Sequence, residues 1–390
     1  MSKKTVCFFL FILISSGFGF AQKLESKIES QLKYSLSEIE KSQKRNPKGV
    51  SPRSMREDTL FMVPSKDWTS GFYAGNLWYT YELTQNPFWK QKAIEFTAPI
   101  EKEKFDSTTH DLGFKLFCSF GNGNRIAPNK AYRDIIIQAS YTLCSRFSPV
   151  VGSLKSWNHS TDKWVFPVII DNMMNLEMLF WAFKETNDSL FYKVAVSHAN
   201  TTMKNHFRAD GSSYHVIDYN PKTGEVLQKN THQGYSHESS WARGQAWGLY
   251  GYSMCYRETG DMKYLQHAER IADFILNNPA LPQDLIPYWD YNDPKIPNAP
   301  KDVSAAAITA SALFELSTFT TLNSKKYRNV AELILKNIDT KHWCKIGTKG
   351  GFLLDNSTGH LPGNHEINVP IVYADYYYLE ALLRSKSLKQ

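Results

Sequence analysis

The chain has 390 residues, of which 42% are hydrophobic and 14% aromatic, a composition typical of a folded globular protein. The formal net charge is +7 and no block of five like charges occurs, so no tail for binding nucleic acid is indicated. A mildly basic surface suits acidic substrates, but an ordinary solvated surface has the same composition. We therefore expect no nucleic-acid partner.

The first residues have the pattern of a secretory signal peptide. Lys3 and Lys4 precede an unbroken apolar run at 6–14, and small residues follow it. The run is too short to cross a bilayer as a stable helix. We expect removal of residues 1–21 and export to the periplasm or the medium, without a membrane anchor. Residues 22–390 should then form a single catalytic domain, whose charge is +5 because two lysines and no acid are lost.

A recurrent sequence motif indicates a repeated helical hairpin. In each copy an apolar, aromatic helix ends in a short polar turn, and a second helix with regularly spaced alanine and isoleucine follows. A single hairpin cannot bury its apolar face alone, so the repeats must stack. The clearest copies lie at 81–97, 184–205 and 257–276. Further pairs are expected at 112–120 with 132–147 and at 302–318 with 327–338, and a last inner helix at 373–383.

Five or six such hairpins fit the length of the chain at roughly 60 residues each. They stack either as an open solenoid or as a closed ring. The first helix of each pair is the more hydrophobic, as expected for an inner ring that is covered by an outer one. The predicted fold is therefore all-α, a closed (α/α)6 barrel made of six helical hairpins.

Two aspartates occupy equivalent places in neighbouring repeats. Asp111 precedes the apolar run at 112–120, and Asp171 follows the apolar residues 168–170 one hairpin later. The starts of the inner helices converge on one rim of a ring, so the two carboxyl groups should face each other there. Either aspartate could instead be a helix N-cap. Paired carboxylates in different surroundings supply the acid and the base of glycosidases, which makes this pair the candidate catalytic site.

A second polar cluster precedes another inner helix. Arg243 and Trp247 are four residues apart and share a helical face, which would suit an anionic sugar ring. The alternative is a core tryptophan with an arginine packed beside it. His215, Trp68 and Trp157 are further candidates for the same rim, and each of them has an equally ordinary structural interpretation.

The four cysteines after residue 21 give no metal-binding pattern. Cys118, Cys144, Cys255 and Cys344 show no C-x-x-C spacing, and three of them lie in apolar, helix-like runs. We expect buried free thiols and no zinc site. No phosphate-binding loop and no nucleophile elbow occurs either, so no metal and no organic cofactor is expected.

Several motifs, in order, resemble those of the unsaturated glucuronyl hydrolases, glycoside hydrolase family 88. The resemblance runs from about residue 60 to residue 384. It implies an (α/α)6 barrel that acts on the C4=C5 double bond that polysaccharide lyases leave in a terminal uronic acid. The motifs are WTSGF at 68–72, HDLGF at 110–114, DNMMNL at 171–176, THQGY at 231–235, WARGQAW at 241–247 and YADYYYLEAL at 373–382.

The resemblance also implies roles for individual residues. Asp171 matches the general acid/base that protonates C4 while water adds at C5, and Asp111 matches the partner that positions the sugar ring. No metal or cofactor is implied, and the partner is an unsaturated acidic oligosaccharide. The positions that match the substrate-binding residues of the family are His215, Thr231, Gln233, Arg243, Trp247, Trp68 and Trp157.

Two other functions remain open. An unsaturated rhamnogalacturonyl hydrolase would share the barrel and related chemistry, and a non-catalytic carbohydrate-binding protein would use the aspartates as acceptors. The sequence predicts neither the source polysaccharide nor the oligomeric state. The loop 355–366 carries His360 and His365 but no lysine or arginine, which argues against a dedicated sulfate pocket in that loop.

Overall fold

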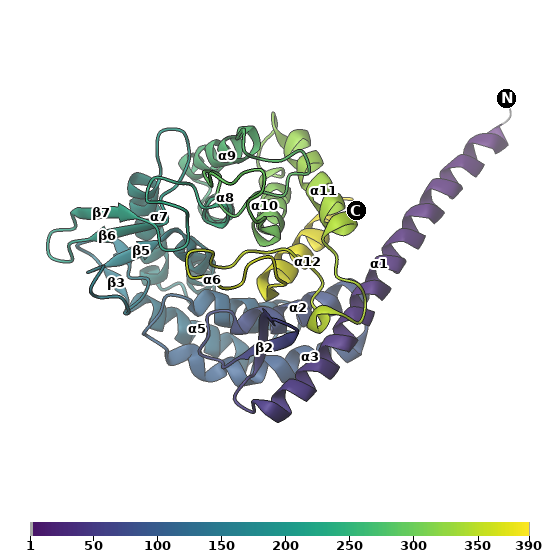
Figure 1. The fold of residues 1–390 in the computed structure, drawn as a ribbon, viewed down its shortest axis with the longest axis horizontal. Helices are drawn as coiled ribbons and strands as arrows, with labels where there is room; N and C mark the ends of the chain where they lie inside the picture. Colours follow the sequence, from purple (N-terminus) through teal and green to yellow (C-terminus); the bar gives the residue numbers. More distant parts are fainter. Residues whose placement is uncertain (1–2, 390) are drawn as a thin grey trace.

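A computed structural model describes residues 3–389, with side chains from Gln22 onward. Its helices form two concentric rings (Figure 1). The inner ring contains α2 (Ser70–Thr84), η2 (Gly113–Gly121) continued by α4 (Asn122–Ile126), η3 (Ile170–Asn175) continued by α6 (Leu176–Thr186), α8 (Ala242–Thr259), α10 (Val303–Leu316) and α12 (Val372–Ser387). The outer ring contains α3 (Pro87–Thr97), α5 (Lys130–Cys144), α7 (Ser189–His206), α9 (Met262–Asn277), α11 (Ser324–Lys341) and α1 (Lys3–Arg45).

The inner ring is closed. Each inner helix contacts the next one in chain order, and the last, α12, packs against the first, α2. Glycine allows neighbouring inner helices to approach closely. A Cβ atom on Gly71 of α2 would lie 2.2 Å from the carbonyl oxygen of Lys115 in η2. The predicted (α/α)6 barrel is confirmed, and the open solenoid is excluded.

Hydrophobicity separates the two rings as predicted. All residues of α10 are buried, whereas α11 buries only Tyr327, Ala331, Ile334, Leu335 and Ile338, one face at helical spacing. Inner helices therefore need apolar or small residues all round, and outer helices need them on one side. The four cysteines after residue 21 are buried free thiols, as expected.

The recurrent sequence motif ends an inner helix and begins the following outer helix. Asn187 ends α6 with φ 57° and Gly260 ends α8 with φ 68°, and both are left-handed C-caps. The next residue, Asp188 or Asp261, is the N-cap of the outer helix, where its side chain accepts a backbone N–H. Such two-residue turns join α2, α6 and α8 to their outer partners α3, α7 and α9.

The outer helix α1 was not predicted. Its residues Ile28, Leu32 and Ile39 are buried against the ring, and Gln31 donates hydrogen bonds to the carbonyls of Thr348 and Phe352. Figure 1 shows that the N-terminal part of α1 extends away from the rings. The predicted signal peptide, residues 1–21, lies outside the described side chains. In the described part of the chain, no helix is long and apolar enough to cross a membrane.

Short strands lie at the end of the barrel where the inner helices begin. The strand β5 (Pro167–Ile169) leads directly into η3. Its pairing with β6 (Val216–Tyr219) brings His215 beside Ile170, whose N–H donates to the His215 carbonyl at 3.1 Å. The remaining elements are β1 (Ser51–Arg56) with β2 (Thr59–Val63), β3 (Phe147–Ser148) with β4 (Ser153–Leu154), β5 (Pro167–Ile169) with β6 (Val216–Tyr219) and β7 (Val226–Asn230), η1 (Ala98–Phe105) and η4 (Lys349–Gly351).

Candidate active site

A cavity of about 400 Å³ opens at the end of the barrel where the inner helices begin. Asp111 and Asp171 both line it, as the repeat spacing predicted. Trp68, Trp157 and Gln233 line it as well. The other lining residues are Arg53, Lys66, Asp106, Thr108, Thr109, His110, Phe114, His159, Ile169, His232, Gly359, His360, His365, Glu366 and Tyr373.

Asp111 is held in its ionised form. The Thr109 hydroxyl donates to its Oδ2 at 2.5 Å, and His110 Nε2 lies 3.1 Å from its Oδ1. Burial alone would raise the pKa of Asp111, but His110 and Thr109 outweigh it, so the pKa lies below the ordinary value of 3.8. The N-cap of η2 is Leu112, so Asp111 is not a helix cap.

Asp171 has the opposite character. It lies within η3, whose N-cap is Ile169, so it does not cap a helix either. Burial raises its pKa to about 6, an effect that His110 and Arg243 partly offset and that Asp111 reinforces. Its Oδ2 is buried and accepts no hydrogen bond from the described residues, while Asp171 as a residue lines the cavity. Asp171 is therefore a carboxyl group that can hold a proton near neutral pH.

His215 lies directly behind Asp171. Its Nδ1 accepts the backbone N–H groups of His232 and Gln233, each at 3.1 Å. The ring proton must then be on Nε2, which lies 3.6 Å from Asp171 Oδ2. Burial, together with the nearby His232, keeps the pKa of His215 well below its ordinary value, so the imidazole is neutral. Nε2 and the Asp171 Oδ2 form no hydrogen bond at this distance, so His215 places a neutral ring next to the carboxyl group without adding a charge.

Two tryptophans form walls of the cavity. Trp68 packs against Tyr373, with ring centroids 5.1 Å apart, and Trp157 stacks on His159 at 4.9 Å. Their faces offer apolar surface for a sugar ring. Gln233 is tied to a neighbouring loop, because its side-chain amide donates to the Gly359 carbonyl at 3.2 Å.

The predicted arginine–indole face is not on the cavity wall. Trp247 has no exposed surface and lies in the aromatic core against Phe114 and Tyr377. Arg243 is 1% exposed, and its guanidinium donates to Asp302 at 2.5 Å and to the Gly359 carbonyl at 2.6 Å. The Arg243 guanidinium is thus already bonded within the protein. The expectation that it is free to bind a substrate carboxylate was wrong. Arg243 acts on the cavity indirectly, by holding the loop at 358–359.

Thr231 also lies off the cavity surface. Its hydroxyl accepts the Gly234 N–H at 2.7 Å, which closes the turn that places Gln233 on the wall. His215, Thr231 and Arg243 thus surround the lining residues instead of facing the cavity.

The hairpin loop at 357–369 also forms a wall of the site, through Gly359, His360, His365 and Glu366, which the sequence did not predict. Arg53 donates to both carboxylate oxygens of Glu366, at 2.7 and 2.9 Å, and also to Asp67 at 3.0 Å. His360 joins the same wall, with its Nε2 3.0 Å from the His232 carbonyl. No local signal marks Arg53, which stands outside the recurrent hairpins. His110, by contrast, was adjacent to Asp111 in the sequence and could have been identified.

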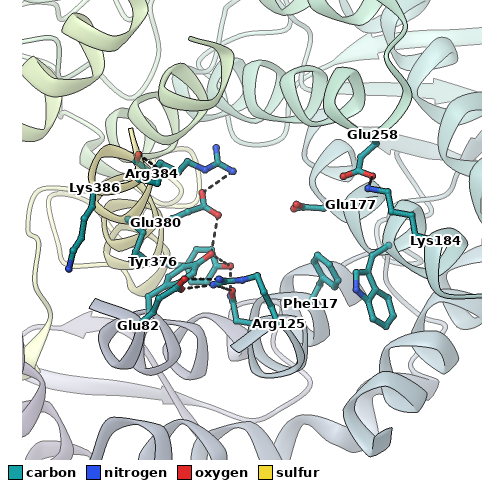
Figure 2. A pocket seen from close by; sticks show the side chains of 16 residues that line it. Glu82, Phe117, Arg125, Glu177, Lys184, Glu258, Tyr376, Glu380, Arg384 and Lys386 are labelled. Atoms are coloured by element: carbon teal, nitrogen blue, oxygen red, sulfur yellow. Dashed lines mark hydrogen bonds and ion pairs between the residues drawn. The ribbon is translucent and has the colours of Figure 1, made fainter. Parts of the chain in front are cut away.

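A larger cavity of about 680 Å³ lies at the opposite end of the barrel, between the later turns of the inner helices. Figure 2 shows its charged side chains facing one another. Arg125 donates to both oxygens of Glu82, at 2.7 and 2.6 Å, and Lys184 lies 2.5 Å from Glu258. These charges are mutually compensated, so the end of the barrel with Asp111 and Asp171 is the better candidate for catalysis.

No family model matches the chain, but the chain is similar to known proteins. The chain is 50% identical over 341 residues to the unsaturated glucuronyl hydrolase of Formosa agariphila, covering 86% of this chain and 85% of that protein. It is 31% identical over 332 residues to the unsaturated chondroitin disaccharide hydrolase of Streptococcus pneumoniae, covering 83% of each.

Solved structures give the same result. An unsaturated glucuronyl hydrolase described as specific for heparin superposes with a TM-score of 0.88 at 46% identity, covering 94% of this chain and 98% of that one. The unsaturated glucuronyl hydrolase of Bacillus sp. GL1 gives a TM-score of 0.84 at 27% identity, covering 92% and 96%. The chain belongs to the unsaturated glucuronyl hydrolase family.

Proposed function

We propose that the chain releases 4,5-unsaturated uronic acid from the non-reducing end of lyase-generated acidic oligosaccharides, by hydrating the vinyl ether double bond. One observation carries the proposal: a single cavity holds two carboxyl groups with opposite pKa shifts, Asp171 upward to about 6 and Asp111 downward. Such a pair provides a proton donor and a fixed negative charge at the same pH.

The reaction begins with protonation of carbon. The Asp171 carboxyl group gives its proton to C4, the electron pair of the double bond forms the new C4–H bond, and positive charge develops at C5 and the ring oxygen. Asp111, ionised, stabilises that charge and positions the ring. An acid with a pKa near the working pH suits this step.

Water completes the hydration. It adds at C5 and returns one proton to the Asp171 carboxylate, which regenerates the acid. The hemiketal formed at C5 opens to a ketone, and C1, now a hemiacetal, expels the remaining saccharide. No side chain attacks the sugar, so the separation of the two carboxyl groups does not predict retention or inversion here.

The test is loss of the double-bond absorbance when purified protein is mixed with an unsaturated disaccharide. Asp171→Asn should reduce kcat by about a thousandfold, in the range expected for removing a general acid. Asp134→Asn, on the exposed face of α5, is the matched control and should leave turnover unchanged. Turnover by Asp171→Asn at the wild-type rate would show that the acid is another group.

A substrate panel separates the alternatives. We propose glycosaminoglycan fragments as the first substrates to test, because relatives act on heparin or chondroitin fragments by their descriptions, and one was solved with dGlcA-GalNAc6S. Fragments of hyaluronan, ulvan and xanthan extend the panel. Turnover of pectin-derived substrates alone would favour a rhamnogalacturonyl hydrolase, and binding without product would favour a carbohydrate-binding protein.

We also propose that the protein works outside the cytoplasm. The basic residues Lys3 and Lys4 and the apolar run at 6–14 support export with removal of residues 1–21. Mass spectrometry of the N-terminus of the exported protein should give Gln22. Retention of the full chain in the cytoplasm would contradict the proposal.

A further inference from the structure

A shallow hollow of about 370 Å³ lies outside the catalytic cavity, on the other side of one of its walls. The wall consists of the segments 106–109 and 155–159, which are joined by a bridge between Thr109 and Trp157. Trp157 faces the catalytic cavity, whereas Lys155 and Asn158 of the same segment face the hollow. The hollow is lined by Ser107, Ser145, Arg146, Phe147, Lys155, Asn158 and Phe166.

Arg146 is a buried cation without an acidic partner in this hollow. It is 8% exposed, and all its hydrogen bonds go to neutral acceptors. Its Nε donates to the Lys155 carbonyl at 2.7 Å, one terminal nitrogen donates to Asn158 Oδ1 at 3.2 Å, and the other donates to the Ser107 carbonyl. A guanidinium has five N–H groups, so one remains on each terminal nitrogen. Free N–H groups of a guanidinium are the donors that recognise oxyanions.

Lys155 adds a second positive charge beside it. Its ammonium group lies 5.9 Å from the centroid of Phe166, another lining residue, and forms no ion pair within the described residues. Burial lowers the pKa of Arg146 to about 10, and burial followed by repulsion from Arg146 lowers the pKa of Lys155. Arg146 is held out of water and the partly exposed Lys155 adds a like charge near it, which raises the free energy of the folded chain unless an anion joins them.

The nearest carboxylates are committed elsewhere. Asp106 is bonded to the buried Lys115 at 2.8 Å, and Asp111 is bonded to Thr109. Asp218 accepts the backbone N–H groups of Val165 and Phe166. They attract Arg146 and Lys155 through space, but none of them forms an ion pair with either cation in the described chain.

We propose that Arg146 and Lys155 form an anion site that binds a sulfate-type oxyanion, either the free ion or a sulfate ester of an oligosaccharide. The guanidinium supplies the N–H donors left free on its terminal nitrogens, and the ammonium group supplies a further donor. The site is separate from the loop 355–366, where the sequence offers no cation, and it does not depend on the proposed hydrolysis.

Calorimetric titration of the folded, full chain with sodium sulfate tests the site, with sodium chloride at equal ionic strength as reference. Wild type should show saturable binding. Lys155→Glu places a carboxylate beside Arg146 and should abolish it, and Lys155→Met should weaken it at least tenfold. Lys325→Glu, an exposed charge reversal on α11, should bind as wild type does. Equal sulfate binding by Lys155→Glu and wild type would overturn the proposal. Binding without saturation would also overturn it, because it would indicate an adventitious ion only.

Kinetics with sulfated and unsulfated unsaturated oligosaccharides of equal length identify the source of the anion. If Lys155→Glu lowers kcat/KM several-fold for the sulfated substrate alone, the site holds a sulfate ester. If sulfate binding is lost while both kcat/KM values stay unchanged, the ligand is the free ion. The calorimetry requires no turnover, so its failure and the failure of the proposed function are distinguishable.

Discussion

At the scale of single residues, the site depends on two aspartates whose surroundings differ. Asp171 is buried with an unsatisfied oxygen, and Asp111 is bonded to His110 and Thr109. The sequence predicted the pair from equivalent places in the repeat. It could not predict that Arg243 is occupied by Asp302, because that contact joins segments 59 residues apart that meet only when the ring closes.

Asp171→Asn should stabilise the protein at neutral pH. A pKa of about 6 in the folded chain lies above the unfolded value, so the free energy of unfolding falls as pH rises from about 4 through 6. Each pKa unit corresponds to roughly 1.4 kcal/mol, so ionised Asp171 costs up to about 3 kcal/mol above pH 7. Urea unfolding should show this gain for Asp171→Asn at pH 7.5 and little difference at pH 4. A gain of the same size at both values would place its cause elsewhere.

At the scale of elements, the hairpins were predictable and the loops were not. The turns between inner and outer helices carry residues with a strong intrinsic preference, such as Asn187 and Gly260 at left-handed C-caps. The loop at 357–369 has no such local code. It is held over the cavity by distant partners, Arg53 on β1 and Arg243 on α8.

Breaking the Arg53–Glu366 pair should loosen that loop. Arg53→Met leaves a buried carboxylate, 6% exposed, without its cation, and we expect the free energy of unfolding to fall by about 3 kcal/mol. Displacement of the loop wall should lower kcat/KM by about tenfold or more. The double variant Arg53→Met/Glu366→Gln removes the unpaired charge and should recover most of the stability. An unchanged kcat/KM in Arg53→Met would exclude the loop as a wall of the site.

At the scale of the whole molecule, closure of the ring was predictable from the number of hairpins, but the sixth outer helix was not. The segment of α1 after residue 21 lacks the recurrent sequence motif and is largely polar, so its few apolar residues did not identify it as part of the barrel. Its burial becomes visible only with the inner ring in place, where Ile28, Leu32 and Ile39 pack.

Leu32→Ala tests whether α1 is an integral part of the fold. Leu32 is 1% exposed, so its truncation leaves a cavity and should lower the free energy of unfolding by about 3 kcal/mol. Leu322→Ala removes the same atoms from a side chain that is 96% exposed, and should change stability by less than about 0.5 kcal/mol. Chemical denaturation monitored by circular dichroism compares them, and equal stability of the two variants would mean that α1 is not packed in solution.

NMR titration of the aspartate carboxyl carbons measures whether one cavity holds both a protonated and an ionised aspartate. Selective labelling with carbon-13 aspartate, and assignment by Asp171→Asn and Asp111→Asn, identifies the two resonances. We expect the Asp171 resonance to titrate at about pH 6 and the Asp111 resonance below 3.8. Titration of both at the ordinary value, or with the two assignments reversed, would mean that Asp171 is not the protonated acid of the site.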